Sequence, residues 1–111
     1  HKDVRPGGVY GATKIWGEAL ARHFSDAYKM SMICVRIGSV TKENVPADAR
    51  QISIYLSHLD VCQILQLSID APADLKYEIF LATSNNRWSY RDLEHPRTIL
   101  GYQPLDSAED L

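Results

Sequence analysis

Residues 9–38 read VYGATKIWGEALARHFSDAYKMSMICVRIG. Apolar side chains recur at three- and four-residue steps over residues 9–29, which is the period of an amphipathic helix. Residues 30–37 are mostly apolar and partly β-branched, so they predict a buried strand, which Gly38 ends. A helix followed directly by a buried strand is typical of an α/β fold.

The rest of the chain continues this alternation. Its patterns predict a polar loop at 39–51, a short extended piece at 52–56, and a helix that Ser57 caps and that ends near Pro72. They then predict a strand at 77–82, a short helix at 96–100 that Gly101 ends, and an irregular tail at 104–111. This order of elements predicts α/β layers with parallel strands. Both strands are apolar enough for burial on both faces, so we expect the complete sheet to be larger than two strands.

Composition narrows the function. The 111 residues suffice for one small domain, and a formal net charge of -2 gives no electrostatic basis for binding nucleic acid or an anionic membrane. The longest apolar runs fall well short of the roughly 20 residues that span a bilayer. Cys34 and Cys62 lie in apolar runs, which predicts buried free thiols in preference to a disulfide or a reactive nucleophile. Free thiols favour a reducing, cytoplasmic setting.

Tyr10 and Lys14 stand four residues apart at the start of the predicted helix. Four residues are about one helical turn, so the two side chains project from the same face. A tyrosine is a poor base at neutral pH, and a neighbouring ammonium lowers its pKa by favouring the phenolate. The pair therefore suits a general acid/base. On these two residues alone, a half-buried tyrosine beside a solvated lysine is the simpler interpretation.

Further segments accompany this pair along the chain. Gly17-Glu18 follow in the same helix, the first strand ends Val35-Arg36-Ile37-Gly38-Ser39, and residues 55–61 read YLSHLDV. A Trp88-containing stretch then precedes Gly101-Tyr102-Gln103-Pro104. With these segments the chain resembles the extended short-chain dehydrogenase/reductases, the NAD-dependent epimerase/dehydratase family. Within that family it is most similar to the uronate dehydrogenase subgroup, over nearly all of the chain from Arg5 onward.

The resemblance implies a role for each of four residues. Tyr10 would be the general base that removes a hydroxyl proton while hydride leaves for NAD, and Lys14 would hold the phenolate and bind the nicotinamide ribose. Ser39 and Arg50 would contact the substrate, Arg50 through a bidentate pair with a uronate carboxylate. From the residues alone, Ser39 can equally be a strand-terminating serine and Arg50 an exposed loop arginine. No metal ligand is implied.

The resemblance also implies the nature of the intact enzyme. The fold would be the C-terminal portion of a doubly wound, Rossmann-like parallel sheet that lacks its N-terminal nucleotide-binding half. The chain would then be one fragment, with the active-site helix and strand at 9–38 and a substrate-binding portion at 39–111. The parent would oxidise a hexuronic acid to an aldarolactone and form a homodimer through the helix that carries Tyr10 and Lys14.

The Gly-rich loop that seats the pyrophosphate in this family is not among the 111 residues. We therefore expect the isolated chain to be inactive. The choice between NAD and NADP stays open, because the residue that selects the ribose would lie upstream. Two alternative functions are an NDP-sugar epimerase or dehydratase, and a non-catalytic, oligomerising remnant of the family.

Weaker signals come from five other positions. His58 and Asp60 suggest an acid/base or metal pair, but helix capping explains them better, and the other histidines show no ligand spacing with them. Trp88 and Tyr90 suggest either walls of a substrate pocket or buried core aromatics. A glycine inside the first helix, Gly17, predicts close packing against another backbone.

Overall fold

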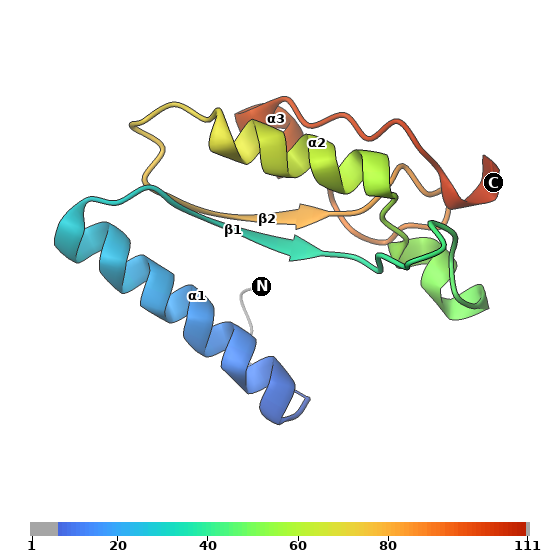
Figure 1. The fold of residues 1–111 in the computed structure, drawn as a ribbon, viewed down its shortest axis with the longest axis horizontal. Helices are drawn as coiled ribbons and strands as arrows, with labels where there is room; N and C mark the ends of the chain where they lie inside the picture. The colour runs from blue at the N-terminus through green and yellow to red at the C-terminus, as the bar shows by residue number, and fades with distance from the viewer. Residues whose placement is uncertain (1–6, 111) are drawn as a thin grey trace. The chain divides into compact units, whose positions relative to one another are not determined.

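The computed structural model describes residues 7–110. The proline and glycines at positions 6–8 predict a loop over residues 1–8, and most of that stretch lies outside the described residues. The elements are α1 (Val9–Tyr28), β1 (Met32–Ile37), the 3-10 helix η1 (Ala49–Ile54), α2 (His58–Ile69), β2 (Tyr77–Ala82), α3 (Glu94–Leu100) and the 3-10 turn η2 (Ala108–Asp110). β1 and β2 run parallel and pair in a two-stranded sheet (Figure 1). The predicted α/β order with parallel strands is confirmed.

The chain divides into two compact units. The first holds the residues up to Cys34 together with Ala73–Glu78, and the second holds Val35–Pro72 together with the residues from Ile79 onward. The first unit therefore contains α1 and the beginnings of both strands. The second contains the carboxyl ends of both strands with α2 and α3.

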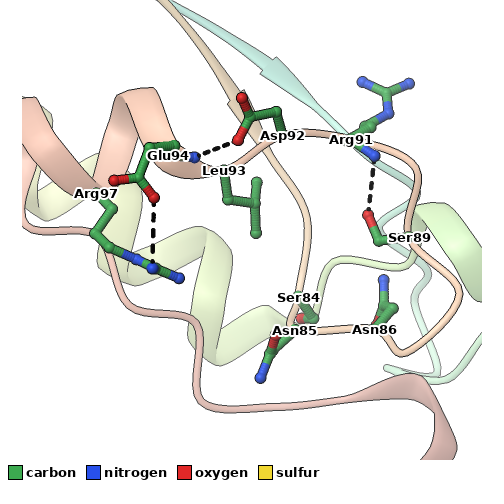
Figure 2. Close-up of a pocket in the computed structure, with 9 residues that line it drawn as sticks. All are labelled: Ser84, Asn85, Asn86, Ser89, Arg91, Asp92, Leu93, Glu94 and Arg97. Carbon is green, nitrogen blue, oxygen red and sulfur yellow. Dashed lines mark hydrogen bonds and ion pairs between the residues drawn. The ribbon is translucent and has the colours of Figure 1, made fainter.

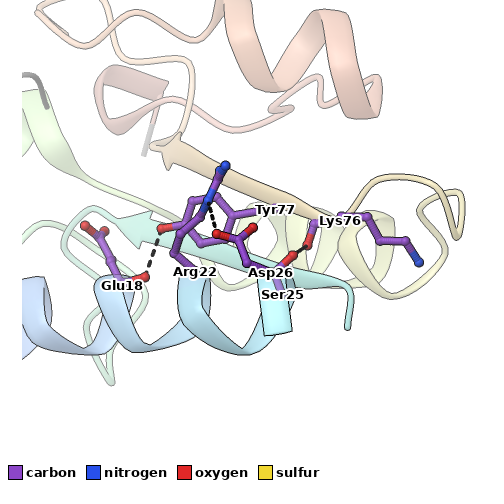
Figure 3. Close-up of polar contacts among 6 residues, drawn as sticks. All are labelled: Glu18, Arg22, Ser25, Asp26, Lys76 and Tyr77. Carbon is purple, nitrogen blue, oxygen red and sulfur yellow. Dashed lines mark hydrogen bonds and ion pairs between the residues drawn. The ribbon is translucent and has the colours of Figure 1, made fainter. Parts of the chain in front are cut away.

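In the first unit, polar side chains attach the C-terminal half of α1 to the start of β2 (Figure 3). The Tyr77 hydroxyl donates to the Glu18 carbonyl at 3.0 Å, and Ser25 Oγ donates to the Lys76 carbonyl at 2.9 Å. The Arg22 guanidinium stacks over the Tyr77 ring, 4.9 Å from its centroid. The helix is therefore held to β2 by hydrogen bonds to backbone carbonyls as well as by side-chain packing.

The apolar stripe of α1 is largely exposed in the described structure. The buried residues of the helix are Ala21 and Ser25, whereas Trp16 is 68% exposed. Gly17 faces open space, because no atom lies within 4 Å of the position that a Cβ would take. The close backbone contact predicted at Gly17 is therefore absent among the described residues.

In the second unit, a small core lies between the sheet and two helices. α2 runs along one face of the sheet and contacts α3 (Figure 1). Ile64 of α2 and Phe80 of β2 are fully buried. Gly101 ends α3 in the left-handed region, with φ of 76°, as predicted. The next residue, Tyr102, is buried and its hydroxyl donates to the Thr83 carbonyl at 2.9 Å.

The extended piece predicted at 52–56 is wrong for most of its length. Residues up to Ile54 belong to η1, because the Asp48 carboxylate accepts the Gln51 N–H at 3.1 Å and so caps a helical turn. Only Tyr55 pairs as a strand, in a parallel bridge with Ser39. The first strand also begins at Met32, two residues later than predicted.

Side-chain burial departs from prediction at four positions. Cys34 and Cys62 form no disulfide within residues 7–110, but Cys62 is exposed and Cys34 only half-buried, whereas the sequence predicts burial for both. The buried residues of α2 are Asp60 and Ile64, so Cys62, two residues from each, points away from the core. Trp88 and Tyr90 are exposed and are not core aromatics.

No helix between residues 7 and 110 is long and apolar enough to cross a membrane.

Candidate active site

Tyr10 and Lys14 lie together on the first turns of α1. The Lys14 ammonium is 5.2 Å from the centroid of the Tyr10 ring, as their spacing predicts. The Tyr10 side chain is 75% exposed, so its hydroxyl is open to a ligand. Thr13 Oγ1 donates to the Tyr10 carbonyl at 2.6 Å, which fixes the backbone of the turn that carries both groups. Geometrically, this is a phenol with a cation beside it on an accessible surface.

Ser39 follows the carboxyl end of β1. Its N–H donates to the Ile54 carbonyl at 2.8 Å, and its carbonyl accepts the Leu56 N–H at 2.9 Å. Its hydroxyl donates to Gln51 Oε1 at 2.7 Å. Ser39 therefore continues the strand pairing rather than ending it, and its side chain faces η1.

The residue before Ser39 must be a glycine. A Cβ on Gly38 would overlap the Ile54 carbonyl oxygen and press on Thr83. The end of β1 and the end of η1 are thus in backbone contact, and that contact sets the position of Ser39.

Arg50 is the second residue of η1 and is exposed. No charged partner of its guanidinium is found among residues 7–110. An exposed guanidinium of this kind is available for a bidentate contact with a carboxylate or a phosphate.

The four predicted site residues fall into two pairs. Tyr10 and Lys14 belong to the first unit and are in contact. Ser39 and Arg50 belong to the second unit, where Gln51, the neighbour of Arg50, accepts the Ser39 hydroxyl. Each pair is therefore positioned by contacts within its own unit.

The structure contains a buried polar network at the carboxyl end of β2, which the sequence did not predict. Asp60 is fully buried, and its carboxylate accepts the Ser84 hydroxyl at 2.6 Å, the Leu105 N–H at 2.8 Å and the Asp106 N–H at 3.1 Å. Ser57 Oγ caps the Asp60 N–H at 3.0 Å, as the sequence predicts. The predicted capping role is therefore right for Ser57 but wrong for the Asp60 carboxylate, which holds the C-terminal segment instead.

His58 and Asp60 form no acid/base pair. The His58 ring approaches the Thr41 carbonyl with Nε2 at 2.6 Å, while Asp60 is occupied by the three donors above. No cluster of three or more potential metal ligands occurs within residues 7–110.

A polar pocket of about 260 Å³ opens beside this network (Figure 2). Its lining contains two arginine and two acidic side chains. One arginine and one acid, Arg97 and Glu94, form an ion pair at 3.5 Å. The remaining lining is mostly hydroxyls and amides, from Ser84, Asn85, Asn86 and Ser89. Sequence patterns gave no sign of this pocket, because its residues gather from a loop and a short helix.

Buried tyrosines surround the network. Burial raises the pKa of Tyr102, and the negative charge of Asp60 raises it further. Burial also raises the pKa of Tyr55, with smaller contributions from Asp106 and Asp60. Both phenols therefore stay protonated and act as hydrogen-bond donors.

Known proteins match this chain in sequence, although no family model does. The uronate dehydrogenase of Agrobacterium fabrum is 36% identical over 106 residues, which are 96% of this chain and 38% of that enzyme. The NAD-dependent glucose-6-phosphate dehydrogenase of Haloferax volcanii is 34% identical over 107 residues, 96% of this chain and 40% of that enzyme. The chain thus spans about two-fifths of the length of the curated relatives it matches.

Solved structures match the fold. A mutant uronate dehydrogenase from Agrobacterium tumefaciens, complexed with NAD, superposes with a TM-score of 0.86 at 34% identity and covers 96% of this chain and 38% of that one. The glucuronic acid dehydrogenase of Chromohalobacter salexigens also gives 0.86, at 31% identity, over 96% of this chain and 38% of that one. The similarity to uronate dehydrogenases drawn from the sequence is confirmed: the chain is similar to these enzymes in sequence and matches the fold of their C-terminal part.

Proposed function

We propose that this chain is the C-terminal, catalytic and substrate-binding part of an NAD-dependent dehydrogenase that oxidises a hexuronic acid to an aldarolactone. The observation that carries the proposal is the accessible pair of Tyr10 and Lys14, in which the Lys14 ammonium lies 5.2 Å from the centroid of the Tyr10 ring. The pair occurs in a chain that is similar to uronate dehydrogenases in sequence and fold. In this assignment residues 9–38 supply the acid/base and residues 39–111 the substrate contacts.

Tyr10 takes the proton from the anomeric hydroxyl of the sugar. Lys14 stabilises the negative charge on the phenol oxygen, because an ammonium favours the anionic form of a neighbouring group. When bound, NAD accepts the hydride that leaves the same carbon. The exposed Tyr10 and Lys14 side chains fit such a ligand, since both present a free polar end, and Lys14 would bind a ribose hydroxyl.

Substrate recognition falls to the second unit. Arg50 has an exposed guanidinium, which suits a bidentate pair with the uronate carboxylate. Ser39 orients a sugar hydroxyl from the end of β1, where ligands of open α/β sheets bind.

A sugar phosphate is the second candidate substrate. The 34% identity to an NAD-dependent glucose-6-phosphate dehydrogenase supports it, and an arginine at position 50 binds phosphate as readily as carboxylate.

The full-length protein that contains this chain should reduce NAD with glucuronate or galacturonate, followed by NADH absorbance. Glucose 6-phosphate and a UDP-sugar serve as the competing substrates. Turnover on glucose 6-phosphate alone would move the assignment to the sugar phosphate, and turnover on the UDP-sugar alone would overturn it.

Tyr10→Phe should lower turnover by about 10²- to 10⁴-fold while NAD binding persists, because the base is lost and the ring is kept. Tyr28→Phe, an exposed tyrosine on the same helix, is the matched control and should keep full activity. Retained turnover in Tyr10→Phe would remove Tyr10 as the base.

We further propose that the protein is a cytoplasmic homodimer of the short-chain dehydrogenase/reductase type, assembled through α1. The exposed apolar stripe of α1, which includes Trp16, Leu20 and Phe24, supports a covered helix in the assembly. The 111-residue chain on its own should show no turnover with NAD and glucuronate, because it lacks the Gly-rich loop that seats the pyrophosphate.

A further inference from the structure

Between Ser39 and Tyr55 the chain leaves the sheet and returns to it, and this excursion carries Ser39 and Arg50. Its two ends are joined by the parallel bridge between Ser39 and Tyr55. The intervening residues include a polar turn, Thr41–Val45, and the 3-10 helix η1. A polar surface turn of this kind, left to itself, has little reason to adopt one conformation.

The turn closes on itself through Thr41. Thr41 Oγ1 donates to the Val45 carbonyl at 2.5 Å and accepts the Val45 N–H at 3.1 Å. The Asn44 N–H donates to the Thr41 carbonyl at 3.2 Å. Asn44 sits in the left-handed region with φ of 59°, which asparagine tolerates better than other side chains.

Asn44 connects this turn to the body of the second unit. The buried Tyr55 hydroxyl donates to the Asn44 carbonyl at 2.6 Å and lies 3.1 Å from Asn44 Oδ1. The His58 N–H, at the start of α2, donates to the same Oδ1 at 2.8 Å. The His58 ring adds a contact from Nε2 to the Thr41 carbonyl at 2.6 Å.

We propose that Asn44, Tyr55 and His58 form a clamp that fixes the Ser39–Arg50 loop and so positions the substrate-binding residues it carries. The positioning role rests on the proposed function, whereas the ordering of the loop does not. Asn44 is a positioning residue, since it acts through the loop and needs no contact with substrate. Burial keeps the Tyr55 phenol protonated and therefore donating.

The clamp can be tested without any assay of activity. Lys42 and Arg50 are trypsin sites inside the loop itself, so limited proteolysis of the folded full-length protein reports how often the loop opens. Asn44→Gly keeps the left-handed backbone and removes the side-chain acceptor. We expect cleavage at Lys42 and Arg50 to become about tenfold faster.

Three variants make this test specific. Asn44→Asp keeps an acceptor oxygen and should restore slow cleavage. Tyr55→Phe removes only the donor hydroxyl and should accelerate cleavage like Asn44→Gly. Lys29→Gly is the matched control, because Lys29 is the other described non-glycine residue with positive φ, at 57°, and lies outside the loop. Cleavage of Asn44→Gly at the rate of the unaltered protein would overturn the clamp.

The positioning role has a separate readout. If the full-length protein oxidises a sugar acid, Asn44→Gly should raise KM for that acid about five- to tenfold, with kcat changed less than about twofold. Asn44→Asp should restore KM. Faster cleavage with unchanged KM would overturn positioning and leave a purely structural clamp. A protein inactive on every sugar acid would instead overturn the proposed function, while the cleavage rates still decide the clamp.

Discussion

The helix that carries Tyr10 and Lys14 and the loop that carries Ser39 and Arg50 are held by different physical means. α1 exposes most of its apolar stripe and is tied to β2 by separate, part-buried hydrogen bonds of Tyr77 and Ser25. The second unit instead buries a polar network around Asp60. Removing one member of the fully buried network leaves several buried partners that water cannot reach, whereas removing one of the separate hydrogen bonds of α1 leaves at most one partner unpaired.

The largest effect should therefore come from Asp60. Asp60→Ala leaves the Ser84 hydroxyl and the N–H groups of Leu105 and Asp106 without an acceptor. We expect the free energy of unfolding of the second unit to fall by about 3 to 5 kcal/mol, measured by urea denaturation. Asp60→Asn, which keeps the shape and one acceptor, should cost about 1 to 3 kcal/mol. A loss below about 1 kcal/mol in Asp60→Ala would break the contrast between the two regions.

The sequence predicted the elements better than their contacts. The bounds of β2 and the cap at Ser57 could be read from the chain, because strand patterning and capping are local. The role of Asp60 could not, since its donors lie 24 to 46 residues away. The 3-10 helix at 49–54 was missed because apolar Ile52 and Ile54 suggest a strand, while Asp48 decides otherwise by capping the turn.

A smaller difference is expected between alanine substitutions at Gly38 and at Gly17, measured as the change in the free energy of unfolding. Gly38→Ala places a methyl group against the Ile54 backbone, which cannot move without shifting η1, so we expect a loss of about 1 to 3 kcal/mol. Gly17→Ala in α1 meets open space and should stabilise the 111-residue chain by about 0.5 to 1 kcal/mol. Urea denaturation of both variants measures the difference. If Gly17→Ala destabilises the full-length protein but not the 111-residue chain, another segment of the full-length protein covers α1 at Gly17.

The candidate site was predictable only in part. The pairing of Tyr10 with Lys14 follows from a four-residue step on one helix, and the structure brings the two together. Ser39 could be placed after a strand, but its hydroxyl partner, Gln51, depends on how the loop returns to the sheet. Asn44 carries a faint signal, since asparagine favours left-handed turns, yet only the fold shows that Tyr55 and His58 converge on it.

The smallest expected difference concerns two tyrosines and alkaline pH. Burial raises the pKa of both Tyr102, in the second unit, and Tyr77, in the first, above the ordinary 10.0. As pH rises past that value, the unfolded chain loses these protons while the folded protein keeps them. The free energy of unfolding must then fall with pH, by at most about 1.4 kcal/mol per pH unit for each tyrosine.

Replacing either tyrosine by phenylalanine should flatten this fall, measured by urea denaturation from about pH 9 to pH 11. Tyr102→Phe should flatten it more, because Tyr102 is fully buried beside the Asp60 carboxylate, whereas Tyr77 is half-buried with the Arg22 guanidinium opposing the shift. A larger effect from Tyr77→Phe would show that Tyr77, the tyrosine of β2 that packs against α1, is the less hydrated of the two. The polar interior of the second unit would then no longer be what distinguishes the two regions.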